Sequence, residues 1–129
     1  MVVSRSRAIL SGSAAIAAVI AIQAFNSFAC YSHDFSSFLA ALGIFLLIPL
    51  LPAIISLATA NPLRALGACL LFVPWLLLAY YTDCARPYTG GGASMIYVAV
   101  ILWGTPCSIV GALVTGPIMR ALGVSVAGR

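Results

Sequence analysis

Lysine and glutamate are absent from the 129-residue sequence, and charged side chains of any kind make up only 6% of it. Soluble proteins carry about 25% charged residues, so this composition excludes an ordinary soluble domain. The basic side chains are all arginines, and they occur singly or in pairs without the positive stripe that is typical of nucleic-acid binding. We therefore expect no nucleic-acid partner and a chain that lies almost entirely in the lipid bilayer.

No Asp, Glu, Lys, Arg or His occurs within four long apolar stretches, which span residues 9–28, 38–59, 65–81 and 94–118. A helix needs about 17–25 apolar residues to cross the hydrocarbon layer, and each stretch is of roughly this length. The sequence therefore predicts an all-α, polytopic fold, a four-helix transmembrane bundle that forms one domain over residues 1–129. Ionisable groups inside a membrane mark ion and proton pathways, so their absence argues against a proton-coupled pump.

The arginines predict how the bundle is oriented. With four spans, one side of the membrane carries five of them, and the opposite side carries a single arginine together with the acidic residues and the histidine. Because cytoplasmic loops are enriched in positive charge, both termini are predicted to be cytoplasmic, in a cell inner membrane. The first set is Arg5, Arg7, Arg64, Arg120 and Arg129, and the second is His33, Asp34, Asp83 and Arg86.

The first apolar stretch has an alternative interpretation as a cleaved signal peptide. Two arginines precede it, and Ser27-Phe28-Ala29 places small residues where a signal peptidase would cut, which would remove residues 1–29. The apolar run is longer than the ~7–15 residues of a signal core, so a membrane span is favoured.

The cysteines that flank the outer ends of spans one and three are Cys30 and Cys84. An oxidising outer compartment would allow them to form a disulfide that joins the two spans. A metal site is the alternative, because thiolate, imidazole and carboxylate ligands could meet if the outer loops converge. Oxidation would consume its two best ligands, so we expect the disulfide and no metal. The ligands of the alternative site would be Cys30, His33, Asp34, Asp83 and Cys84.

Gln23 and Asn26 are the strongest polar groups within a span, and their spacing places them on one helix face. Hydrogen bonds between helices are their expected role, and the lining of a pore or ligand site is the alternative. Hydroxyl groups of span four are expected to bond to carbonyls of their own helix and to need no other partner. These belong to Thr105, Ser108 and Thr115.

Span four carries small residues at every fourth position, namely Gly104, Ser108, Ala112 and Gly116. Such a row lets two helix backbones approach closely in lipid. The sequence predicts that this ridge packs on span one or on another subunit.

Prolines within the spans predict kinks, because each removes a backbone hydrogen bond. They include Pro49, Pro52, Pro74 and Pro106, and they leave open whether the bundle is static or hinged.

No nucleophile–base pair, cofactor motif or phosphate-binding loop is present, so we expect a protein that is not an enzyme and needs no cofactor. The favoured function is that of an accessory, assembly or interaction subunit that acts by helix packing. Its partners would be the lipid bilayer and either another membrane protein or a second copy of itself. The alternatives are a small oligomeric transporter or channel, and an immunity-type protein that blocks a toxin at the membrane.

Overall fold

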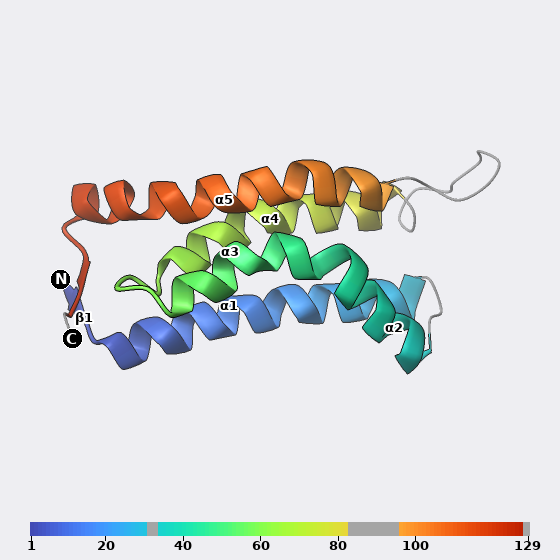
Figure 1. Ribbon diagram of the computed structural model, residues 1–129, viewed down its shortest axis with the longest axis horizontal. Helices are drawn as coiled ribbons and strands as arrows, with labels where there is room; N and C mark the ends of the chain where they lie inside the picture. Colours follow the sequence, from blue (N-terminus) through green and yellow to red (C-terminus); the bar gives the residue numbers. More distant parts are fainter. Residues whose placement is uncertain (31–33, 83–95, 128–129) are drawn as a thin grey trace.

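The computed structural model describes residues 1–30, 34–82 and 96–127, and four helical rods dominate this part of the chain (Figure 1). The first rod is a helix that continues into a π-helical turn, and the second is two helices joined by a π-helical turn. The elements in order are β1 (Val2–Val3), α1 (Arg5–Phe25), η1 (Asn26–Cys30), α2 (Phe35–Ala41), η2 (Leu42–Leu46), α3 (Leu47–Leu57), α4 (Arg64–Tyr80), α5 (Ile96–Leu122) and β2 (Ser125–Val126).

Two side-chain caps set where the first rods begin. The Ser4 hydroxyl accepts a hydrogen bond from the Arg7 amide at 3.3 Å, which starts α1. The Asp34 carboxylate accepts one from the Ser37 amide at 2.7 Å, which starts α2. A cap satisfies an amide that has no partner within the helix. Both helices therefore begin before the apolar stretches predicted from hydropathy.

The last helix runs past residue 118, the predicted end of span four, and stops at Leu122. Gly123 follows with a φ of +71°, a left-handed conformation that ends helices and that glycine adopts without strain. Apolar composition locates the part of a helix that lies in lipid, whereas the caps decide where the backbone stops winding.

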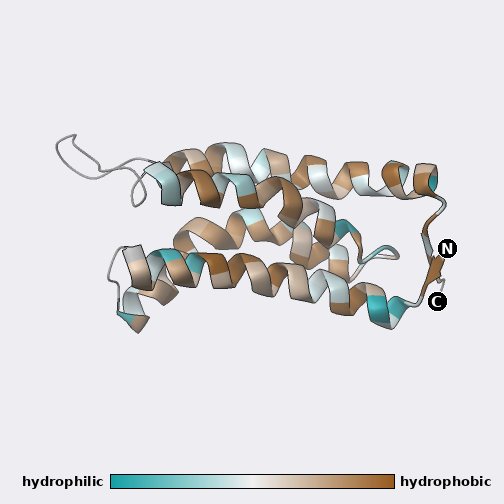
Figure 2. Cartoon of the chain, turned by 180° about the vertical axis from the view of Figure 1, so that it is seen from behind, coloured by the Kyte–Doolittle hydropathy of each residue, from teal (hydrophilic) through white to brown (hydrophobic). Residues whose placement is uncertain are grey.

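Three of the rods contain segments long and apolar enough to cross a membrane, namely Arg5–Ala29, Phe35–Leu57 and Val98–Leu122. The all-α prediction is confirmed in this form, with four helical rods of which three are candidate spans. The fourth, α4, is apolar but has only 17 residues, or about 25 Å at 1.5 Å per residue. Strongly hydrophilic residues gather near the ends of the rods (Figure 2).

Helix α4 is at the centre of the packing and contacts α1, α3 and α5. Its buried residues recur at the three- and four-residue spacing of one helix face. The core of the bundle forms along this face, so the shortest rod supplies the surface on which the others meet. The buried residues of α4 are Ala65, Ala68, Cys69, Phe72, Leu76 and Ala79.

Proline explains the irregular winding of the second rod. Pro49 has no amide hydrogen, and a proline ring clashes with the carbonyl four residues earlier, which would be that of Phe45. The turn η2 lies at this point, and Leu46 at its end has a φ of −111° and a ψ of −25°, away from regular α-helical values. A wider turn relieves the clash and joins α2 to α3 in one continuous rod.

The two ends of the chain meet in a short parallel ladder that pairs Val2 with Ser125 and Val3 with Val126. The Met1 ammonium group donates a hydrogen bond of 2.7 Å to the Gly123 carbonyl oxygen. The termini and the connection between α3 and α4 thus lie at the same end of the bundle (Figure 1).

Candidate interaction sites

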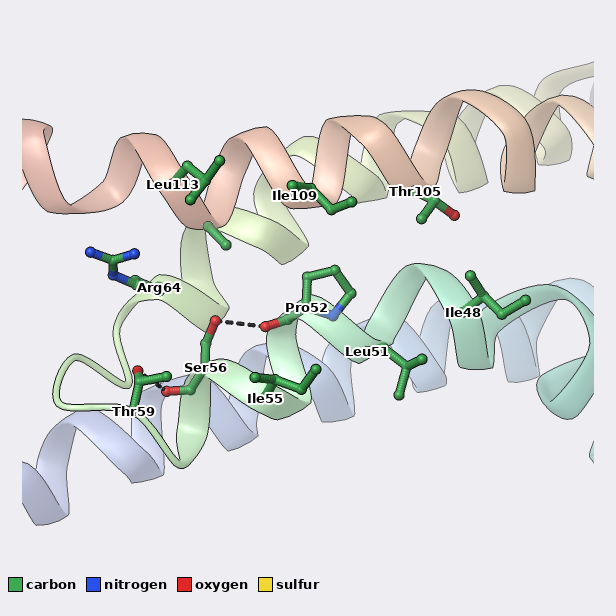
Figure 3. Close-up of a pocket in the computed structure, with 11 residues that line it drawn as sticks. Ile48, Leu51, Pro52, Ile55, Ser56, Thr59, Arg64, Thr105, Ile109 and Leu113 are labelled. Atoms are coloured by element: carbon green, nitrogen blue, oxygen red, sulfur yellow. Dashed lines mark hydrogen bonds between the residues drawn. The ribbon is translucent and has the colours of Figure 1, made fainter.

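A groove runs between α3 and α5, and we call it the α3–α5 groove (Figure 3). It has a volume of about 510 Å³ and walls of isoleucine and leucine side chains. These side chains are largely exposed, with Ile55 at 61% and Leu113 at 59%. The residues that line the groove are Ile48, Leu51, Pro52, Ile55, Ser56, Thr59, Arg64, Thr105, Ile109, Ala112 and Leu113.

Two hydroxyl groups in the groove are satisfied within their own chain segment. The Ser56 hydroxyl donates to the Pro52 carbonyl oxygen, and the Thr59 hydroxyl donates to the Ser56 carbonyl oxygen, both at 2.6 Å (Figure 3). Such local bonds satisfy polar groups without a partner helix. The groove therefore presents mainly hydrocarbon along α3.

Thr105 differs from the sequence prediction. Its hydroxyl oxygen is buried in the groove and has no hydrogen-bond partner in the structure. The expectation was correct for Thr115, whose hydroxyl donates to the Gly111 carbonyl oxygen at 2.7 Å. The two threonines share a helix and a residue type, so spacing alone does not predict which hydroxyl finds a partner.

A smaller and more polar cavity adjoins the groove at the end of the bundle that carries the termini, and we call it the arginine pocket. It has a volume of about 220 Å³ and includes Arg64, which also lines the α3–α5 groove, and Arg120 from the end of α5. The Asn61 amide nitrogen donates to the Met119 sulfur at 3.3 Å, while its amide oxygen is buried without a partner. The pocket is lined by Ala60, Asn61, Arg64, Gly116, Met119, Arg120, Val124, Ser125 and Val126.

The predicted small-residue ridge of α5 is buried within the chain, with Ser108 at 1% and Ala112 at 8% exposure. A Cβ on Gly104 would lie 2.7 Å from the Phe72 ring, and one on Gly116 would lie 3.2 Å from an Arg64 guanidinium nitrogen. Both neighbours belong to α4, so the ridge faces a helix that the sequence did not single out.

The closest approach between helices was missed from the sequence. A Cβ on Gly67 of α4 would overlap the Gly111 carbonyl oxygen and the Thr115 hydroxyl. A Cβ on Gly111 would lie 3.1 Å from the Ala68 Cα, and would overlap the Gly67 carbonyl oxygen. The available signal was that Gly67 is the one glycine of the third apolar stretch. We call this contact, together with the Gly104–Phe72 contact, the α4–α5 seam.

A third depression lies where α1 faces η2 and α3, and we call it the Gly43 notch. It has a volume of about 270 Å³, and a Cβ on Gly43 would meet nothing within 4 Å. The notch thus combines an open backbone position with bulky apolar walls. Those walls are Ile16, Ile20, Leu42, Leu46, Leu47, Leu50 and Ile54.

Gln23 and Asn26 are both buried, at 1% exposure each. The Gln23 amide nitrogen donates to the Ser27 hydroxyl at 3.0 Å, a bond within the same rod. The Asn26 amide nitrogen has no partner in the structure, and Asn26 lines an apolar cavity between α1 and α4 that Phe25 and Tyr80 also border. The proposed role in joining helices remains a prediction for both residues.

The predicted disulfide lies outside the described residues, because Cys84 and the side chain of Cys30 are not part of them. Within the described part the structure has no disulfide, and Cys69 and Cys107 are free thiols. The described residues also contain no cluster that could hold a metal ion. Of the alternative ligands, Asp34 is described and caps α2, whereas His33 and Asp83 are not described.

Comparisons with known proteins leave these geometric features as the only guide to function. No protein-family model, no curated protein and no solved structure matches the chain.

Proposed function

We propose that the protein is a four-span subunit of a cell inner membrane, with α4 as the additional span and both termini in the cytoplasm. The end of the bundle that carries the termini also carries Arg5, Arg7, Arg64 and Arg120, which agrees with positive-inside orientation. The central position of α4 supports this arrangement, because three other apolar rods pack against it.

We further propose that it acts as an accessory or assembly subunit that binds another membrane protein, or a second copy of itself, by helix packing. The α5 ridge was the surface that first suggested this function, and it is buried against α4. A partner must therefore use another face, and the Gly43 notch is the best candidate.

The observation that supports this assignment is the empty space over Gly43. Glycine within a helix costs about 1 kcal/mol relative to alanine, so its presence there calls for a packing or functional reason. Small residues between bulky ones let a second helix approach closely where lipid provides no hydrophobic driving force. The walls of the notch would hold the side chains of the approaching helix.

Blue-native electrophoresis of the protein extracted in mild detergent tests this function. We expect a complex larger than the monomer, and we expect Gly43→Leu to dissociate it by filling the notch. Ala18→Leu is the matched control, because it places the same leucine side chain at an exposed position of α1 outside the notch. A lone monomer, or a complex that survives Gly43→Leu as well as Ala18→Leu, would contradict the proposal.

An oligomeric transporter or channel is the second candidate, and the unpartnered Asn26 amide beside the α1–α4 cavity favours it. Polar groups buried in a membrane helix often line a substrate path. Liposome flux assays test this alternative, and wild-type protein without uptake or conductance would remove it.

A further inference from the structure

The arginine pocket and the α3–α5 groove share Arg64 among their lining residues, and together we call them the combined cavity. Figure 3 shows the Arg64 side chain at the same end of the groove as Thr59, with Ile109 and Ile48 toward the other end. The combined cavity is therefore polar and cationic at the end near the termini and hydrocarbon-like along the rods. This is the distribution of polarity in a molecule with an ionic head and an apolar tail.

The charge of the pocket is uncompensated within the described part of the chain. Neither Arg64 nor Arg120 forms an ion pair there. The one acidic residue that the structure describes is Asp34, which caps α2 at the opposite end of the bundle (Figure 1). Two cations that share a small cavity repel each other, and an anion bound between them would relieve that repulsion.

The chemistry of the pocket suits a phosphate group. Arginine presents a planar fork of donors that matches two phosphate oxygens, and Ser125 is among the residues that line the same cavity. Gly116 makes room for this arrangement, since a Cβ there would lie 3.2 Å from the Arg64 guanidinium nitrogen. Arg64 can thus lie close over α5 while it remains part of both cavities.

We propose that this combined cavity binds a phospholipid with an anionic headgroup, with its phosphate at Arg64 and Arg120 and an acyl chain in the α3–α5 groove. Basic pockets between helices on the cytoplasmic side of a membrane are suited to acidic headgroups. Free phosphate shares the headgroup chemistry but leaves the 510 Å³ groove without an occupant. The groove therefore favours the lipid over the free ion.

Native mass spectrometry of the full-length protein in detergent tests the proposal, with phosphatidylglycerol and phosphatidylcholine of identical acyl chains as probes. We expect tighter binding of phosphatidylglycerol, and a loss of about five- to tenfold for Arg64→Gln and for Arg120→Gln separately. Arg5→Gln is the matched control, because it removes one charge at the same end of the bundle outside both cavities. It should leave the preference intact. If Arg64→Gln does not fold, Arg120→Gln and the wild-type preference still decide the question.

Two further measurements separate the lipid from a free anion. Leu113→Trp should narrow the groove from an exposed position, so we expect it to weaken binding of both lipids while the preference for phosphatidylglycerol remains. Inorganic phosphate at millimolar concentration should displace little phosphatidylglycerol. Equal binding of the two lipids, an Arg5→Gln effect as large as that of Arg64→Gln, an unaltered affinity in Leu113→Trp, or full displacement by phosphate would each overturn the proposal.

Discussion

The two sides of α5 are packed in different ways. Toward α4, the seam brings backbone against backbone at Gly67 and Gly111. Toward α3, the side chains of α5 border a groove of about 510 Å³ and remain largely exposed. Glycine removes the side chains that would hold α4 and α5 apart, whereas Ile109 and Leu113 line the groove between α5 and α3. One helix therefore has a closely packed side that joins it to α4 and an open side of exposed apolar side chains.

The largest effect is expected from Gly67→Ala, which would disrupt the close packing of α5 against α4. The new methyl group would overlap backbone and hydroxyl atoms of α5, and these cannot move without separating the helices. We expect a loss of about 3 kcal/mol in the free energy of unfolding, at the upper end for overpacking. The measurement is unfolding in mixed micelles, followed by far-ultraviolet circular dichroism.

The control for this experiment is Gly43→Ala, where the added Cβ meets nothing within 4 Å. Its better helix propensity should leave stability unchanged or raise it by up to about 1 kcal/mol. If the two variants lowered the free energy of unfolding equally, close backbone contact at Gly67 would not be what stabilises the α4–α5 seam.

A smaller effect is expected from Gly104→Ala, also in the seam. The added methyl group would meet the Phe72 ring at 2.7 Å, and a ring edge can shift where a backbone cannot. After the gain in helix propensity, the net loss should be about 1 kcal/mol. Trp75 lies near the same position, so a change in its fluorescence would report the shifted ring. A loss as large as that of Gly67→Ala would mean that Phe72 is as immobile as backbone.

The smallest effect, and one of opposite sign, is expected from Thr105→Val on the open side. Valine keeps the shape of the side chain and removes a buried hydroxyl that has no partner, so stability should rise by about 0.5–1 kcal/mol. Thr115→Val should instead lower stability, because it removes a hydroxyl that bonds to the Gly111 carbonyl oxygen. Thermal unfolding of both variants in one detergent measures the two changes in stability. A shift of the melting temperature in the same direction for both variants would contradict the prediction.

Local composition predicted the rods, because hydropathy over about 20 residues depends on the segment alone. The ends of the rods were predicted to within a few residues. Caps such as Asp34 account for part of the difference between the predicted and the observed ends. The small-residue ridge was also visible, since a four-residue spacing can be recognised within one helix.

The helix that this ridge contacts was not predictable. Gly67 and Gly111 stand in different spans, and their contact depends on how two rods cross and rotate relative to each other. The α3–α5 groove is still harder to predict, because its shape depends on how α3 and α5 both pack against α4. A pattern along one helix contains no information about a space between two others.

The ladder between β1 and β2 has a consequence for the order of events during synthesis. Met1 leaves the ribosome long before Gly123, its hydrogen-bond partner 122 residues away, has been made. β1 therefore remains unpaired until β2 has been made and lies on the same side of the membrane. In the proposed four-span arrangement, failure of any one rod to insert would leave the two strands on opposite faces of the membrane, where they could not pair. The ladder therefore cannot close over a chain in which a single rod has failed to insert.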